Sequence, residues 1–215
     1  QLGSNARFVF AVSDLRGEVI ALYRMPDATV FSIDVAVSKS RNVSYYANEA
    51  ELQDVDTIPG IPKGTAFTSR TFRYVAEPRF PEGIDGFPPG PFSIFNDGPF
   101  DNTTARQIGA PLPASAFQSV LGYDSFNPQT NFRDPTDILN QSGIVFFPGS
   151  APLYRAGSGA LIGGFGVSGD GVDQDDVNTF FGSTGFGVPN RKLRADEVFV
   201  SNIRLPYQKF NRNPE

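Results

Sequence analysis

The clearest pattern near the start of the chain is an alternation of apolar and polar positions. Residues 6–14 (ARFVFAVSD) and 18–24 (EVIALYR) are rich in β-branched and aromatic residues, and Leu15-Arg16-Gly17 separates them. Alternation with a period of two, broken by a short turn that contains glycine, is typical of a β-hairpin. We therefore predict an antiparallel hairpin over residues 6–24, which the Pro26-Asp27 pair ends.

The period then changes to that of a helix over residues 31–52. Apolar and small residues recur at steps of three and four, at Ile33, Ala36, Val37, Ser40, Val43 and Ala47. The small residues among them would let the helix lie close to a sheet. We expect Lys39, Arg41 and Glu49 to point away from that contact. A second, short helix is predicted over residues 65–77.

The second half of the chain opens with a long irregular stretch over residues 78–142. It holds ten prolines and many scattered aromatics. A loop this long in a compact domain is usually a lid, a binding loop or an oligomer contact. Strand-like sequence returns at 143–147, followed by a predicted hairpin of 152–155 with 160–167 around Gly157-Ser158-Gly159. A helix over 170–181 and a tail strand over 197–205 complete the prediction.

This order of elements predicts an α+β domain with a central antiparallel sheet, because hairpins make antiparallel sheets and helices cover their faces. We assign residues 1–190 to one domain, with 78–142 as a long Pro-rich insertion. Residues 191–215 carry more basic than acidic groups and are predicted to form a strand or arm.

Composition narrows the function. The chain has no histidine and no cysteine, which excludes Ser-His-Asp triads, His-ligated metals, thiolate sites and disulfides. A binding or assembly role is therefore favoured over ordinary histidine-based catalysis. The net charge of −5 argues against nucleic acid as a partner. No apolar run is long enough for a transmembrane segment. The absence of thiols fits an exported bacterial protein, in the periplasm or outside the cell.

Two clusters near residue 170 are candidate sites. Gly163, Gly164 and Gly166 would let a ligand approach a strand end, or would let a helix pack closely on that strand. Asp170, Asp173, Asp175 and Asp176 follow at once. Of these, Asp170, Asp173 and Asp176 are our candidate ligands for Ca²⁺ or Mg²⁺. The alternative for the carboxylates is capping of the predicted helix and interaction with its dipole.

Several segments together resemble the GlcG/HbpS family of haem-binding proteins. The stretch 143–176 (GIVFFPGSAPLYRAGSGALIGGFGVSGDGVDQDD) carries the family's Gly-Gly-x-Gly-Val-Ser-Gly strand end and acidic helix start. The hairpin of residues 11–24, the helix with Ser32, Ala36, Lys39 and Arg41, and the stretch 64–71 (GTAFTSRT) are also similar. The resemblance covers roughly residues 8–181.

The resemblance implies a profilin-like α/β/α sandwich, haem as cofactor and a homo-oligomer or larger assembly. It also implies a binding set for haem. In a chain without histidine or cysteine, an axial ligand could only be Met25, a weak oxygen donor or one of the seven tyrosines, of which Tyr45 and Tyr46 are the preferred pair. Lys39 and Arg41 could meet the propionates, and Gly149, Ser150, Gly163, Gly164 and Gly166 would line the site. The alternative for the tyrosines is packing as amphipathic residues at the border of sheet and helix. The family's N-terminal helix is not found before the first strand. A separate segment is therefore expected to cover that face of the sheet.

Three functions remain open from the sequence. The first is a haem (tetrapyrrole) or small-ligand binding protein of the GlcG/HbpS type, which rests on the resemblance alone. The second is a non-catalytic structural or assembly subunit of an extracytoplasmic oligomer. The third, an enzyme that acts on a small acid through Asp and Arg chemistry, trails because no catalytic carboxylate pair can be identified.

Overall fold

A four-stranded sheet forms the centre of the chain in the computed structural model, which describes residues 5–58, 60–76, 100–101, 106–107, 144–200 and 203–208. Its strands are β1 (Phe8–Ser13), β2 (Val19–Arg24), β5 (Ser150–Tyr154) and β6 (Leu161–Gly169). The helices are α1 (Ser32–Ala47), α2 (Ser69–Ala76) and α4 (Val172–Gly182). Shorter elements are the 3₁₀ turns η1 (Asp54–Asp56) and η4 (Ala195–Glu197), and the strands β3 (Phe100–Asp101), β4 (Arg106–Gln107), β7 (Phe199–Val200) and β8 (Ile203–Arg204).

The strand order is β2-β1-β6-β5, and every neighbouring pair is antiparallel. Two local hairpins, β1–β2 and β5–β6, are joined by the pairing of β1 with β6. That pairing runs from Phe8 opposite Gly169 to Ser13 opposite Gly164. The central strand pair therefore joins the part of the chain before the long insertion to the part after it.

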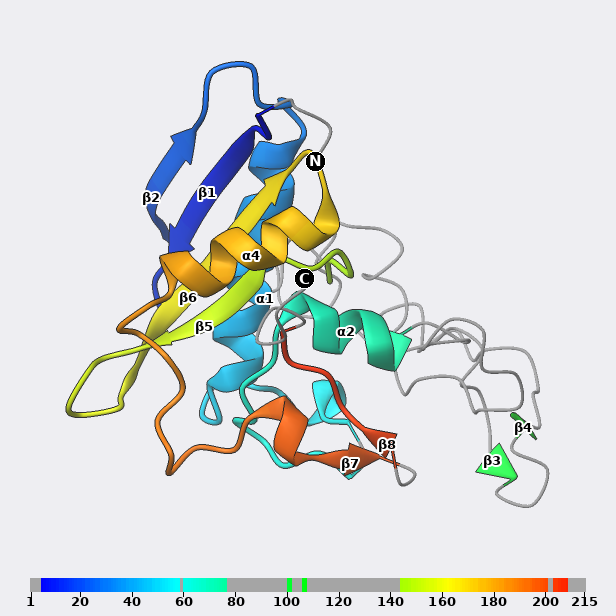
Figure 1. Cartoon of the computed structure of the whole chain (residues 1–215). Helices are drawn as coiled ribbons and strands as arrows, with labels where there is room; N and C mark the ends of the chain where they lie inside the picture. The colour runs from blue at the N-terminus through cyan, green and yellow to red at the C-terminus, as the bar shows by residue number, and fades with distance from the viewer. Residues whose placement is uncertain are drawn as a thin grey trace.

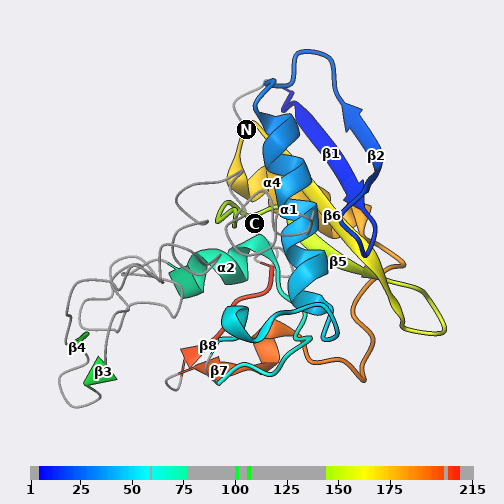
Figure 2. The ribbon, with the colours of Figure 1, turned by 180° about the vertical axis from the view of Figure 1, so that it is seen from behind.

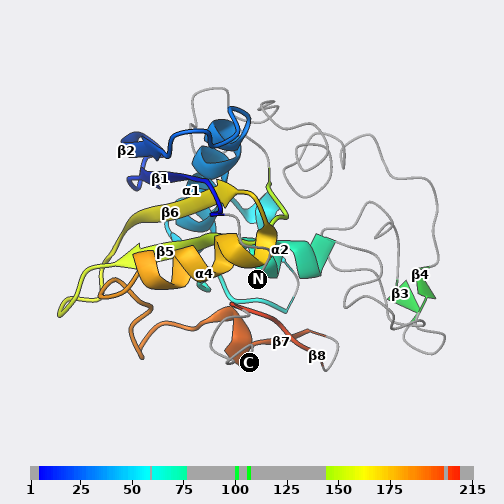
Figure 3. The same cartoon turned by 45° about the horizontal axis from the view of Figure 1, so that its top comes forward.

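The two longer helices lie on opposite faces of the sheet (Figures 1 and 2). Helix α1 packs across β1, β6 and β5, whereas α4 packs on β6 and β5. Figure 3 shows the resulting three layers, with the sheet between α1 and α4. The helical cover is therefore centred on β6, and β2 lies outside it.

Alternation along the strands sends apolar residues to both faces. On the α1 side, Val9 and Ala11 pack with Ala36 of the helix. On the α4 side, Phe8 packs with Phe165, in a cluster that also contains Leu153 and Val167. Sheet strands that are covered on both faces bury apolar side chains in both directions, as these do.

A second apolar core lies at the C-terminal end of α1. Val43, Tyr45 and Tyr46 enter it from the helix, and the rest of it comes from the segments that follow and from the tail: Leu52, Ile58, Phe67, Phe72, Ile144, Ala195, Val198 and Leu205. The backbone of Ala66 exchanges hydrogen bonds with Leu193 and Ala195 at 2.9 and 3.0 Å. These bonds fix the start of the tail against the segment before α2.

The α+β fold with a central antiparallel sheet and helices on its faces is confirmed. Both predicted hairpins and the predicted helices occur, although α1 ends at Ala47, before the predicted limit. Two details were wrong. Residues 144–147 form no strand, and the tail forms η4, β7 and β8 in place of one continuous strand. Within the insertion 78–142, only β3 and β4 belong to the described residues.

Candidate functional site

The glycines of β6 lie where α1 crosses the sheet. A Cβ atom on Gly164 would be 1.9 Å from the backbone oxygen of Ser40, and one on Gly166 would be 2.0 Å from that of Ala36. On Gly163, which has a φ of +151°, a Cβ atom would be 2.0 Å from the oxygen of Ser13. These three predicted ligand positions are therefore filled by the protein's own backbone, which favours the packing alternative.

Lys39 is a fully buried charged residue of α1. It leaves α1 on the sheet side, contrary to our expectation that it points away, and its side chain is fully buried. Its Nζ donates to the carbonyls of Pro148 (2.7 Å) and Val167 (2.6 Å) and to Oδ2 of Asp175 (3.0 Å). All three protons of the ammonium group thus have an acceptor. Because Asp175 belongs to α4, the ion pair links the helices on the two faces of the sheet.

Burial opposes ionisation of both partners. Desolvation lowers the pKa of Lys39, and the carboxylate of Asp175 partly offsets this effect. Desolvation also raises the pKa of Asp175 to about 6, against the opposing effect of Lys39. The second oxygen of this carboxylate, Oδ1, has no hydrogen-bond partner among the described residues.

Gly149 makes room for this pair. Its φ is +118°, and a Cβ atom there would be 2.6 Å from Cβ of Asp175 and 3.1 Å from Nζ of Lys39. The next residue, Ser150, accepts a hydrogen bond from the backbone N–H of Ser69 at 2.8 Å, and the two hydroxyls lie 2.6 Å apart. The structure thus gathers Lys39, Gly149 and Ser150 around a buried junction of β5 with α1, α2 and α4.

Two acidic residues in the first turns of α4 form ion pairs with an arginine. Arg70 of α2 donates to Asp176 through Nε at 2.8 Å and to Asp173 through Nη2 at 3.2 Å. Asp170 instead accepts the backbone N–H of Arg7 at 2.7 Å. Among the residues that the structure describes, no three carboxylates gather where they could hold a metal ion. The metal site stays a prediction without geometric support.

The remaining residues of the predicted haem set lie apart. Tyr45 and Tyr46 are buried in the second core, where Tyr45 donates to Asp56 at 2.5 Å and the Tyr46 ring stacks on Phe67 at 5.4 Å. Arg41 donates to the carbonyl of Gly17 at 2.8 Å. The two tyrosines thus belong to the second core, whereas Lys39, Gly149 and Ser150 belong to the buried junction.

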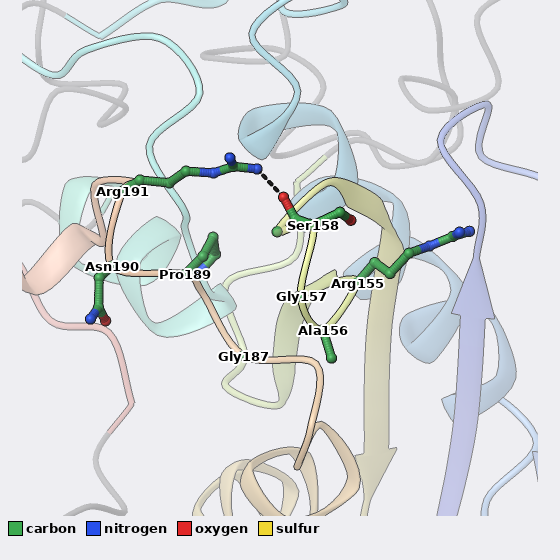
Figure 4. A pocket seen from close by; sticks show the side chains of 9 residues that line it. Arg155, Ala156, Gly157, Ser158, Gly187, Pro189, Asn190 and Arg191 are labelled. Atoms are coloured by element: carbon green, nitrogen blue, oxygen red, sulfur yellow. Dashed lines mark hydrogen bonds between the residues drawn. The ribbon is translucent and has the colours of Figure 1, made fainter.

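An open pocket lies between the β5–β6 turn and the segment after α4 (Figure 4). Its volume is about 420 Å³, and turn residues 155–159 face Gly187, Pro189, Asn190 and Arg191 across it. The Arg191 side chain reaches over to donate to the carbonyl of Ser158, whereas Arg155 extends away (Figure 4). The turn can be predicted from the sequence but the pocket cannot, because the second wall of the pocket comes from a segment with no motif.

The two outer edges of the sheet differ in their cover. At β5, the backbone N–H of Tyr154 donates to the carbonyl of Phe186 at 2.9 Å, and Ser150 bonds to Ser69. At β2, all six residues are exposed, and no other strand of the described chain pairs with the outer side. We call its large apolar side chains, Val19, Ile20, Leu22 and Tyr23, the β2 edge surface. Ile20 and Tyr23 are 64% and 60% exposed.

Sequence reasoning missed two of the residues that organise the buried junction. Arg70 and Asp175 both lie in predicted helices. However, no local spacing relates Asp175 to Lys39, which lies 136 residues before it. One signal was available: a lysine among the small residues of a predicted buried face needs a carboxylate partner.

The comparisons with known proteins show that this chain is similar to solved structures in architecture only. No protein-family model matches the sequence, and neither does any curated protein. Among solved structures, the PduOC–haem complex is similar with a TM-score of 0.44 and 20% identity, covering 86% of this chain and 81% of that chain. The Klebsiella pneumoniae protein ORFY, described as DUF336, gives 0.42 and 18%, covering 85% and 76%. At these values we draw no function from either protein.

Proposed function

We propose that this chain is a non-catalytic assembly domain that associates with protein through the open β2 edge of its sheet. The observation that carries the proposal is the β2 edge surface. Monomeric proteins protect an edge strand with charges, proline or a covering segment, because its unpaired backbone groups would otherwise recruit another strand. Here four of the six side chains of the edge strand are large, apolar and exposed, and Arg24 at its end is its one charged residue.

The arrangement of the charged groups supports the same proposal. Lys39 with Asp175, and Arg70 with Asp176, join elements of the domain to one another. Four large exposed apolar residues lie together on the strand that the helices leave uncovered, while others, such as Phe31 and Phe181, lie elsewhere on the surface. Among the described residues, no helix is long and apolar enough to cross a membrane.

The test is the mass of the full chain in solution, measured by light scattering over a hundredfold range of protein concentration. We expect an oligomer, and we expect Leu22→Lys to shift it toward the monomer. Phe199→Lys is the matched control, because Phe199 is equally apolar and 62% exposed but lies on β7. A chain that remains monomeric throughout, with or without Leu22→Lys, would overturn the proposal.

Binding of a small ligand, haem included, is the second candidate. The residues predicted to hold haem do not fit it, because both tyrosines are packed inside the second core. In addition, the ammonium group of Lys39 already donates to three acceptors within the protein. The observation that favours a ligand is instead the open pocket of Figure 4, whose volume falls in the range of small-molecule sites. Arg191 would supply its cationic group.

A titration with haemin, followed by absorbance in the Soret region, tests this candidate. A spectral change that Arg191→Ala weakens would support ligand binding at the pocket. An unchanged difference spectrum at micromolar haemin would contradict haem as the ligand.

A further inference from the structure

The open pocket between the β5–β6 turn and the segment after α4 has a lining that indicates the chemistry of its ligand (Figure 4). We infer that it binds a small organic acid with a flat apolar body, such as an aromatic carboxylate, whose carboxylate contacts Arg191. This inference rests on the second candidate function, the binding of a small ligand, and it adds the chemical class of that ligand.

Hydrogen bonds within each wall fix the shape of the pocket. In the turn, the backbone N–H of Gly159 donates to the carbonyl of Arg155, and the N–H of Arg155 donates to the carbonyl of Ala160, both at 2.8 Å. In the opposite wall, the N–H of Lys192 donates to the carbonyl of Pro189, also at 2.8 Å. The pocket is therefore formed by the chain itself, as is usual for small-molecule sites.

The two walls approach each other most closely at Gly159. This residue is buried and has a φ of +60°, and a Cβ atom there would be 3.0 Å from Cγ of Pro189 and 3.1 Å from Nη2 of Arg191. The lack of a side chain at Gly159 thus leaves room for Arg191 to span the pocket and donate to the carbonyl of Ser158. This bond uses one of the five N–H donors of the guanidinium group, so the others can form paired hydrogen bonds with a carboxylate.

The charge of the lining selects an anion. Nine residues line the pocket, and they include two arginines, Arg155 and Arg191, and no acidic residue. Lys192, which follows Arg191, lies instead with its Nζ 4.0 Å from Oε2 of Glu49. The chain as a whole carries a net charge of −5. A hollow lined by positive charge in an acidic chain attracts anions in preference to cations and neutral molecules.

The size and the walls of the pocket favour an organic anion over an inorganic one. The volume of about 420 Å³ compares with about 30 Å³ for one molecule of liquid water, so a bare oxyanion would leave most of the pocket to solvent. Ala156 and Pro189 supply apolar surface, and the glycines of the lining leave backbone uncovered. A flat apolar body can lie against these walls while its carboxylate contacts Arg191.

A titration of the full chain with benzoate, followed in two-dimensional NMR spectra, tests the inference. We expect benzoate to shift the backbone amide signals of the two walls, residues 155–159 and 187–191. Two further probes separate the parts of the proposal. Benzamide has the ring of benzoate without the charge, and inorganic phosphate has a charge without the ring. Each should bind at least about fivefold more weakly than benzoate.

The second arm of the experiment changes the protein. Arg191→Gln should raise the dissociation constant of benzoate by about tenfold or more, because it removes the charge-assisted contact. Arg204→Gln is the matched control, since Arg204 is also an exposed arginine but lies on β8, outside the lining. It should leave benzoate binding unchanged. Circular dichroism of Arg191→Gln should match that of the parent, since Arg191 is exposed.

The outcomes separate this inference from the proposed functions. Benzoate that shifts no signal at millimolar concentration, or that binds Arg191→Gln as tightly as the parent, would overturn the inference. Benzamide that binds as tightly as benzoate would overturn the anionic class and leave small-ligand binding standing. Phosphate that binds as tightly would overturn the flat organic body. None of these results bears on the assembly function, because its test is the mass of the chain in solution.

Discussion

At the scale of single residues, Lys39 shows how a charge can organise a core. Taking a lysine and an aspartate out of water costs several kcal/mol each, and only a close partner and further hydrogen bonds offset it. Lys39 has both, in Asp175 and in the carbonyls of Pro148 and Val167. The pair therefore specifies how α1, β6 and α4 fit together.

Lys39→Met should lower the free energy of unfolding by about 3–5 kcal/mol, because it leaves the Asp175 carboxylate buried without its cation. Urea unfolding followed by circular dichroism measures the change. The double variant Lys39→Met with Asp175→Leu should recover part of the loss. Recovery stays incomplete because the two carbonyls still lose their donor. A double variant less stable than the single one would show that the ion pair is not the cause.

The same variant should depend on pH in a definite direction. Without Lys39, desolvation of Asp175 is unopposed, and its folded-state pKa rises beyond the value of about 6 in the parent chain. A carboxyl pKa that is raised on folding gives stability that is greatest below the unfolded pKa and is lost as pH rises through the folded pKa. The difference in stability between variant and parent should therefore be smaller at pH 5 than at pH 7.5. A difference that is equal at both pH values would contradict this assignment.

At the scale of elements, the contact of α1 with β6 depends on glycines of β6, which have no side chain. Helix and strand approach until backbone oxygens of Ala36 and Ser40 occupy the places where Cβ atoms of Gly166 and Gly164 would be. Ala36 and Ser40 are themselves small and fully buried. This approach brings α1 close enough for Lys39 to reach Val167.

Gly166→Ala should destabilise the domain by about 1–3 kcal/mol or more, because α1 must move away from the sheet. Gly187→Ala is the control. A Cβ atom on Gly187 meets nothing within 4 Å, so its effect should stay within about 0.5 kcal/mol. Thermal unfolding of both variants measures the difference. Equal stability of the two variants would show that α1 can move away from the sheet without lowering the free energy of unfolding.

At the scale of the whole molecule, the described sheet has one covered and one open edge. The segment around Phe186 and the start of α2 cover β5, whereas β2 is exposed along its length. An open apolar edge is a liability for a monomer and an interface for an oligomer.

Association should therefore make the thermal stability of the chain depend on its concentration. A ligand or partner that binds only the folded state raises the midpoint, at about 2–4 °C per kcal/mol for a chain of this size. We expect the midpoint of the parent chain to rise over a hundredfold increase in concentration. Leu22→Lys should flatten that dependence, and an equal slope in both chains would argue against β2 as the interface.

Much of the architecture could be predicted from local patterns. Alternation over residues 6–24 and helical spacing over 31–52 identify β1, β2 and α1, because each pattern is repeated within one element. The strand predicted over residues 143–147 was wrong. A short apolar run has no period that distinguishes a strand from another buried segment, and Ile144 packs in the second core without belonging to a strand.

The candidate site was less predictable, because its partners are distant in sequence. The glycines and acids near residue 170 are conspicuous in the sequence, but whether a glycine faces a ligand or a helix depends on what crosses the strand. Lys39 was placed on the wrong side for the same reason, since its partner lies in α4.

The kinds of elements, their order and the chemistry that the chain lacks follow from local sequence patterns and from composition. Periodicity is a local property, and the absence of histidine and cysteine needs no structure to be read. Three features depend on tertiary packing: α1 lies against Gly164 and Gly166, Lys39 pairs with Asp175, and β2 has no strand on its outer side within the described part of the chain. These are contacts between segments far apart in the chain, and they depend on which faces meet when the sheet and its helices pack.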